Sequence, residues 1–152
     1  MISVGDTLPN LKLFNEKNEL IELNSFKGKK LILFFYPKDN TPGCTKESIE
    51  FSEKLAEFES NNTVVVGVSK DSVKSHQSFC SKHNLKVMLL SDPEMKLINT
   101  CGVWQEKKNY GKTYMGIVRS TFLFNEELEL IETWKNVKVN GHVDRVFSSV
   151  KS

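Results

Sequence analysis

The chain has 152 residues, of which 39% are hydrophobic and 26% charged, and its formal net charge is +2. This length supports one domain with a buried core, and the interspersed charges of both signs exclude a basic face for nucleic acid. No apolar run approaches the roughly 18 residues that a membrane-spanning helix needs.

Hydrophobic periodicity divides the chain into alternating strands and helices. Runs of β-branched and aromatic residues predict strands, and apolar residues repeating at three and four positions predict helices. In chain order the expected elements are a hairpin (11–14 and 20–23), a strand (31–36), a helix (42–60), a strand (63–69), a helix (72–83), a strand (85–90), a helix opening at Asp92-Pro93, a polar loop (102–116), a hairpin (120–124 and 128–134) and a helix (141–150). This order predicts one α/β domain over residues 1–152, with a central mixed sheet, helices on both faces and antiparallel strands from the terminal hairpins.

The junction between the strand at 31–36 and the helix that follows it carries the most informative residues. Thr41 suits a helix N-cap, and Pro42 suits the first helical position. Cys44 is then in the first turn, near free backbone N–H groups and the positive end of the helix dipole. A thiolate is stabilised there, and the thiolate is the reactive form of cysteine. The sequence therefore predicts a reactive cysteine, with a buried and unreactive thiol as the common alternative.

The same stretch resembles a known family. Pro37-x-x-x-Thr41-x-x-Cys44 matches the active-site motif of the peroxiredoxins, and residues 35–45 resemble their Q-type, or bacterioferritin comigratory protein, subfamily. The resemblance to this subfamily continues further along the chain, at residues 110–112, 116–122 and 137–142. The resemblance implies a thioredoxin-like fold with an N-terminal β-hairpin extension. It also implies a thiol peroxidase that reduces hydrogen peroxide and organic hydroperoxides, with thioredoxin as the reductant.

The resemblance implies a role for each matched residue. Cys44 is expected to be the peroxidatic cysteine, which attacks the peroxide and becomes a sulfenic acid. Thr41 is expected to hydrogen-bond the peroxide and the thiolate, and Arg119 to stabilise the thiolate and the charge that develops as the O–O bond breaks. The supporting residues are expected to be Pro37, which shields the sulfur, Gly43, which offers its backbone N–H, and Glu47, which orients the arginine.

The sulfenic acid must then be resolved by another thiol. Many Q-type members carry that cysteine five residues after the peroxidatic one, where this chain has Ile49, whereas Cys80 matches a second branch with the cysteine on the following helix. The resemblance therefore implies an intramolecular Cys44–Cys80 disulfide in an atypical two-cysteine cycle. Both helices are expected to loosen when it forms, and Cys101 is expected to be a packed thiol. The alternatives are resolution by an external thiol and a non-enzymatic redox sensor.

Other chemistries have weaker support. His76, Cys80 and His83 recur at helical spacing and could offer zinc ligands, but nothing nearby completes a shell of four. The sequence contains no Cys-x-x-Cys, the motif of a thioredoxin-type oxidoreductase. Residues 111–113 resemble the end of a phosphate-binding loop but lack its preceding glycine. No cofactor or metal is expected, and His142 is expected to be a satisfied polar residue rather than a catalytic base. Three widely spaced cysteines and no signal peptide predict a cytoplasmic protein, expected to be a monomer without nucleic-acid or membrane partners.

Overall fold

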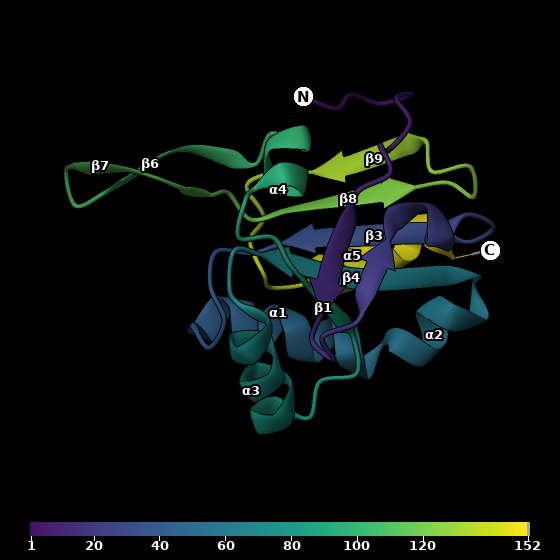
Figure 1. Cartoon of the computed structure of the whole chain (residues 1–152), viewed down its shortest axis with the longest axis horizontal. Helices are drawn as coiled ribbons and strands as arrows, with labels where there is room; N and C mark the ends of the chain where they lie inside the picture. The colour runs from purple at the N-terminus through teal and green to yellow at the C-terminus, as the bar shows by residue number, and fades with distance from the viewer. Residues whose placement is uncertain (152) are drawn as a thin grey trace.

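A mixed β-sheet with helices on its two faces organises residues 1–151, the part of the chain that the computed structural model describes (Figure 1). Its strands are β1 (Lys12–Asn15), β2 (Leu20–Glu22), β3 (Lys30–Phe35), β4 (Thr63–Ser69), β5 (Met88–Ser91), β8 (Ser120–Phe124) and β9 (Leu130–Trp134). Within these residues the strand order is β2-β1-β5-β4-β3-β8-β9. β5, β4 and β3 are parallel, and β1 and β8 join them antiparallel. The predicted mixed sheet, with antiparallel strands from both terminal hairpins, is confirmed.

Helices cover the two faces of this sheet unequally. They are η1 (Leu23–Phe26, a 3-10 helix), α1 (Pro42–Glu53), α2 (Leu55–Ser60), α3 (Val73–His83), α4 (Lys96–Thr100) and α5 (His142–Val150). Phe51 of α1, Phe58 of α2, Phe79 of α3 and Val146 of α5 belong to one apolar cluster, whereas Leu97 of α4 belongs to the other. No helix within residues 1–151 is long and apolar enough to cross a membrane.

The central strand β3 explains why the two clusters lie on opposite faces. Leu33 and Phe35 belong to the cluster with α4, whereas Ile32 and Phe34 belong to the cluster with α1, α2, α3 and α5. Successive side chains of a strand point to opposite faces, and a strand buried on both faces reads as a continuous apolar run. Each fully buried side chain of this size stabilises the fold by about 1.5–3 kcal/mol. This rigid strand leads directly into the loop that precedes Cys44.

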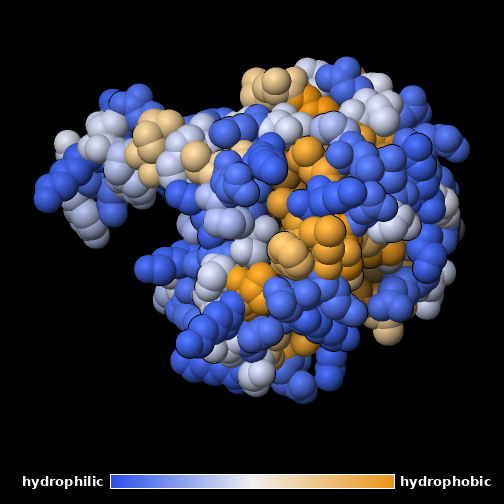
Figure 2. Space-filling view, viewed as in Figure 1, coloured by the Kyte–Doolittle hydropathy of each residue, from blue (hydrophilic) through white to orange (hydrophobic). Residues whose placement is uncertain are grey.

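A two-stranded ribbon replaces the polar loop expected over residues 102–116, so that prediction is wrong. Strands β6 (Trp104–Asn109) and β7 (Lys112–Ile117) pair with each other and project from the body of the molecule (Figure 1). Most of the ribbon is exposed and hydrophilic (Figure 2), so no alternation of apolar and polar residues marks its strands in the sequence. Tyr110 and Gly111, with φ of 52° and 77°, form the tight turn that closes it.

The helix predicted over residues 42–60 is divided in two at Lys54. The backbone of Lys54 has φ −97° and ψ 2°, which ends α1, and α2 begins at the next residue. The side chain of Lys54 reaches across to α5, where Nζ lies 3.3 Å from Asp144 Oδ1 and 4.8 Å from the centre of the Phe147 ring. The break lets α1 and α2 pack along different directions, and α1 and α5 become neighbours through these contacts.

Two other elements begin later than predicted. β5 starts at Met88 rather than at residue 85, because the N–H groups of Lys86 and Val87 donate to Ser52 Oγ instead of entering the sheet. α4 starts at Lys96 rather than at Asp92. The carboxylate of Asp92 still accepts from the N–H of Lys96, so the predicted capping residue acts from outside the helix.

Candidate active site

The junction of β3 and α1 places Cys44 in the first helical turn, as predicted. Pro42 is the first helical residue, and Thr41 occupies the N-cap position with φ −84° and ψ 152°. The Cys44 side chain is fully buried. The first N–H groups of a helix have no acceptor within the helix, and they lie at the positive end of its dipole. The fold therefore presents this sulfur to a local environment that favours negative charge.

The hydroxyl of Thr41 has a different partner from the one expected. Thr41 Oγ1 donates to the carbonyl of Lys38 at 2.8 Å and makes no capping hydrogen bond to α1. Among residues 1–151, no hydrogen bond joins Thr41 to Cys44 in this structure. The hydroxyl has one proton to donate, so it must rotate away from Lys38 before it can donate to a thiolate. Pro37 is half-buried at the start of the same loop.

Arg119 lies on the short connection between β7 and β8, and its guanidinium reaches Cys44. Nη2 lies 3.2 Å from Cys44 Sγ, and Nη1 donates to Glu47 Oε1 at 2.7 Å. Glu47 is one turn after Cys44 on α1, so the guanidinium lies between a sulfur and a carboxylate of the same helix. Burial opposes the charge of the arginine, but Glu47 and Cys44 together outweigh it and raise the pKa of Arg119 above its ordinary value.

Gly43 leaves the space that this guanidinium occupies. A Cβ atom at position 43 would lie only 3.1 Å from Arg119 Nη2, which is closer than an ordinary van der Waals contact. A larger residue would therefore displace the guanidinium from the sulfur. The geometry thus gives Gly43 a steric reason to be glycine, beside the backbone N–H that was predicted to act at the site.

Glu47 is completely buried, and Thr121 and His142, which were not predicted to take part in the site, lie behind it. Its second oxygen, Oε2, has no hydrogen-bond donor among residues 1–151 and lies 3.9 Å from His142 Nε2. The same nitrogen is 2.8 Å from Thr121 Oγ1. Burial, and to a smaller extent the charges of Arg145 and Arg119, lowers the pKa of His142 to about 4. His142 is therefore neutral at neutral pH and cannot supply a second cation to the carboxylate.

The burial of Glu47 makes the stability of the protein depend on pH. Burial raises the pKa of this carboxyl from 4.5 to about 7, and the attraction of Arg119 opposes only part of that rise. The folded chain keeps a proton that the unfolded chain loses, so the resulting stabilisation is complete below pH 4.5 and is lost as the pH rises through about 7. The free energy of unfolding of Glu47→Gln, relative to the unsubstituted chain, should rise by roughly 2–3 kcal/mol across this interval.

Urea unfolding at several pH values between these limits measures that difference. Glu53→Gln is the matched control, because Glu53 is an exposed carboxylate of the same helix. If Glu47→Gln and Glu53→Gln followed the same pH dependence, the burial of Glu47 would have no such consequence.

The other two cysteines lie on different elements, and all three are free thiols. Cys80 is half-buried on the last turn of α3, where it lines a surface hollow together with Glu16. Burial, with smaller contributions from Glu16 and Asp39, raises the pKa of the Cys80 thiol to about 12. Cys101 is 2% exposed in the apolar core, and burial raises its pKa to about 12 as well. No disulfide joins Cys44 and Cys80 in this structure.

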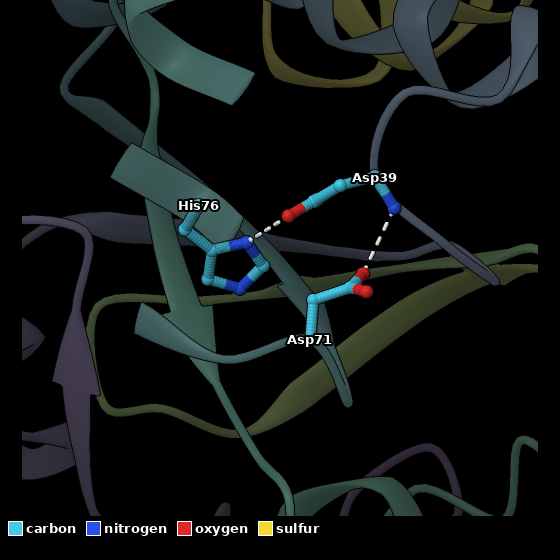
Figure 3. A group of neighbouring side chains, drawn as sticks. All are labelled: Asp39, Asp71 and His76. Carbon is cyan, nitrogen blue, oxygen red and sulfur yellow. Dashed lines mark hydrogen bonds and ion pairs between the residues drawn. The ribbon is translucent and has the colours of Figure 1, made fainter. Parts of the chain in front are cut away.

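One group of side chains in residues 1–151 has donor atoms close enough to share a metal ion. Asp39, Asp71 and His76 place these atoms within 4.8 Å of one another (Figure 3). However, His76 Nδ1 lies 2.8 Å from Asp39 Oδ2, His76 Nε2 lies 3.1 Å from the carbonyl oxygen of Leu90, and Asp71 Oδ2 accepts from the N–H of Asp39 at 2.8 Å. The donor atoms are thus engaged within the protein. The zinc set that would include Cys80 also requires a nitrogen of His76 that is already bonded.

Comparison with known proteins gives a consistent result. Residues 4–133 match the AhpC/TSA family. Peroxiredoxin Bcp of Bacillus subtilis is 45% identical over 150 residues, which cover 99% of this chain and 96% of that protein. A crystal structure of a cysteine-to-serine mutant of Xylella fastidiosa PrxQ has a TM-score of 0.95 at 41% identity, covering 99% of this chain and 96% of that one. The bacterioferritin comigratory protein of Xanthomonas campestris, studied for its alkyl peroxide reduction activity, has a TM-score of 0.88 at 40% identity, covering 93% and 90%.

Proposed function

This chain belongs to the AhpC/TSA family as a peroxiredoxin of the Bcp, or PrxQ, type, and we propose that it reduces hydroperoxides through a two-cysteine cycle of Cys44 and Cys80. Membership makes the chain a peroxide-reducing peroxidase and confirms the predicted thioredoxin-like fold. The oxidation of Cys44, the first step of this cycle, is supported above all by the guanidinium of Arg119, which lies 3.2 Å from the sulfur of Cys44. Hydrogen peroxide and organic hydroperoxides are the proposed substrates, and the Xanthomonas relative is described for alkyl peroxides.

The first step oxidises Cys44. Its thiolate gives an electron pair to one oxygen of ROOH, the O–O bond breaks, and the leaving RO⁻ takes a proton to become ROH. Cys44 remains as a sulfenic acid. Negative charge moves from the sulfur to the leaving oxygen, and Arg119, with the free N–H groups of Gly43 and Cys44, can stabilise it at both ends of that path. Glu47 holds the arginine in place, and a rotated Thr41 hydroxyl can donate to the peroxide.

The second step forms the disulfide. The thiol of Cys80 attacks the sulfur of the Cys44 sulfenic acid, the S–S bond forms, and the hydroxyl leaves as water with the thiol proton. Cys80 suits this role better than Cys101, because Cys80 is half-buried beside a surface hollow whereas Cys101 is enclosed in the core. A disulfide requires Cα atoms within about 7 Å of each other. The two cysteines are on different helices, and we expect both α1 and α3 to loosen when the disulfide forms.

The third step restores the thiols. A dithiol reductant transfers two electrons and two protons to the Cys44–Cys80 disulfide and becomes a disulfide itself. Overall, ROOH and the dithiol give ROH, water and the oxidised reductant, so no bound cofactor is needed. Thioredoxin is the proposed reductant, and the open hollow beside Cys80 offers a protein dithiol an approach.

A cytoplasmic monomer is the proposed working form. The large apolar side chains that are exposed are spread over the N-terminal segment, the β1–β2 hairpin, the β6–β7 ribbon and β9. A specific and stable interface usually buries about 1,200–2,000 Å² in one contiguous patch, and within residues 1–151 no single element gathers these exposed side chains. Free thiols with long sequence separations suit a reducing compartment.

The Cys80→Ser chain tests the cycle. One equivalent of hydrogen peroxide should still convert Cys44 to a sulfenic acid, which dimedone traps and mass spectrometry identifies. No intramolecular disulfide should form, because the resolving sulfur is missing. Steady-state consumption of NADPH with thioredoxin and its reductase should fall by at least about tenfold, since the reductase chain delivers electrons to a disulfide.

Cys101→Ala is the matched control and should keep both the disulfide and the turnover. Undiminished turnover in Cys80→Ser would instead assign resolution to an external thiol. If the unsubstituted chain, supplied with thioredoxin, stopped after one equivalent of peroxide, a redox sensor would be the better description.

A further inference from the structure

The loop between β3 and α1 is anchored by Asp39, a residue outside the steps proposed for Cys44. The residues on either side of Asp39 are exposed, but its own side chain is buried. Asp39 Oδ1 accepts from the hydroxyl of Tyr36 at 2.6 Å. Oδ2 accepts from the hydroxyl of Ser75 at 2.7 Å and lies 2.8 Å from His76 Nδ1. Two of these three partners belong to α3, the helix that carries Cys80.

The contact between Asp39 and His76 has the geometry of a buried ion pair. His76 Nδ1 faces the carboxylate and Nε2 faces the carbonyl oxygen of Leu90, so each ring nitrogen lies against a hydrogen-bond acceptor. Burial opposes ionisation of Asp39, but the hydrogen bonds from His76, Tyr36 and Ser75 outweigh it and lower the pKa of this carboxyl. The two side chains are 1% and 0% exposed. Removing one partner would leave the other as an uncompensated buried charge.

The pair also provides a large part of the buried contacts that hold α3 against the rest of the protein. The buried side chains of this helix are His76 and Phe79, so one of its two anchors is the ion pair. The loop is held from a second direction, because the N–H of Asp39 donates to Asp71 on the connection between β4 and α3 (Figure 3). Cys80 follows His76 by one helical turn. Asp39 therefore joins the segment that leads to Cys44 with the segment that carries Cys80, through His76 and Ser75.

We propose that Asp39 and His76 are a positioning pair, which holds the Cys44 loop and the Cys80 helix in the arrangement that reacts with peroxide and which separates before the disulfide forms. The second half of this statement rests on the proposed Cys44–Cys80 cycle. While the pair is joined, the loop is fixed beside Arg119 and α3 stays folded. When it parts, the loop and α3 lose a restraint that they share, and the hydrogen bonds of Asp39 with Ser75 and Asp71 still join the two segments.

The pair then determines how long the Cys44 sulfenic acid persists. A persistent sulfenic acid can react with a second ROOH, which transfers an oxygen to the sulfur to give a sulfinic acid and leaves as ROH. A chain whose pair is weakened should reach the disulfide sooner and lose less Cys44 to the sulfinic acid. It should also react more slowly with the first peroxide, because the loop before Cys44 is no longer fixed.

The His76→Gln chain tests this. Rapid mixing with hydrogen peroxide, quenching and mass spectrometry resolve the sulfenic, disulfide and sulfinic forms of Cys44. The peroxide-independent conversion of sulfenic acid to disulfide should accelerate by about tenfold, and the initial oxidation should slow by several fold. Amide exchange in the reduced chain should increase both in residues 37–41 and in α3.

Two further variants separate positioning from general stability. Leu85→Ala is the matched control, because Leu85 packs against the same apolar cluster at the end of α3, and its N–H bonds to the carbonyl of Cys80. This variant should increase exchange in α3 while leaving residues 37–41 and the initial oxidation unchanged. Asp39→Asn combined with His76→Gln should perturb both segments less than either single change, because neither charge is then buried alone.

Unchanged exchange in residues 37–41 of His76→Gln, or kinetics equal to those of Leu85→Ala, would overturn the positioning role. Failure of the unsubstituted chain to form the Cys44–Cys80 disulfide would overturn the proposed cycle instead. In that case the exchange of residues 37–41 and the rate of the initial oxidation still decide whether the pair positions the loop.

Discussion

Replacing Cys44 by serine should abolish peroxide reduction, lowering the second-order rate constant by at least about four orders of magnitude. The reaction needs a sulfur nucleophile that attacks as the thiolate and accepts an oxygen atom, and a serine hydroxyl cannot replace it in either respect. In Cys44→Ser the guanidinium of Arg119 and the first N–H groups of α1 would remain but would face a neutral oxygen. The rate of peroxide loss under single-turnover conditions, followed directly in solution, measures the effect.

The substitution is nearly isosteric, so thermal unfolding of Cys44→Ser should resemble that of the unsubstituted chain and exclude misfolding as the cause. Cys101→Ala removes a sulfur from the core instead of from the site and should retain the activity. Peroxide loss in Cys44→Ser within about tenfold of the original rate would place the reacting sulfur at Cys80 or Cys101.

The position of Cys44 was predictable because its determinants are local. An apolar strand buried on both faces, an extended residue at Thr41 and a proline at the first helical position define the junction within a few residues. The helix could be extended correctly only to Glu53, since the break at Lys54 depends on contacts with α5. Local rules therefore placed Cys44 at the start of its helix, and tertiary contacts determined how far that helix runs.

The surroundings of Cys44 were only partly predictable, because they come from distant parts of the chain. Glu47 and Arg119 match family positions. In the fold, the guanidinium of Arg119 contacts both the sulfur of Cys44 and the carboxylate of Glu47. Thr121 and His142 lie in segments that resemble the family, but nothing local links them to Glu47, because a threonine in a strand and a histidine at a helix start are ordinary in those places. Only the pairing of β8 with β3 and the packing of α5 bring them behind Glu47.

The buried contacts that hold α3 in place were likewise only partly predictable from the sequence. The sequence predicts a helix over residues 72–83, which the structure confirms over Val73–His83, and it places His76 at helical spacing from Cys80 as a zinc candidate. In the structure His76 instead pairs with Asp39, which precedes it by 37 residues. A buried charge pair between separate segments leaves no periodic pattern, so hydrophobic periodicity could not find it.

Arg119→Lys should lower the rate constant for peroxide by roughly 10²- to 10³-fold, although the positive charge is kept. The two guanidinium nitrogens serve different partners, Nη2 at 3.2 Å from Cys44 Sγ and Nη1 at 2.7 Å from Glu47 Oε1. A single ammonium group on a flexible stem cannot occupy both positions. Arg145→Lys, at an exposed arginine of α5, is the matched control and should leave the rate unchanged. Stopped-flow mixing with hydrogen peroxide measures both.

Removing the guanidinium entirely separates catalysis from stability. In Arg119→Met the buried carboxyl of Glu47 loses its partner, which costs up to about 3 kcal/mol while the group is ionised. Because burial already raises the pKa of Glu47 to about 7, that pKa should rise further and the group should become neutral. Adding Glu47→Gln removes the unpaired group, so the double variant should regain thermal stability but not reactivity. If it regained both, the arginine would act only by supporting the fold.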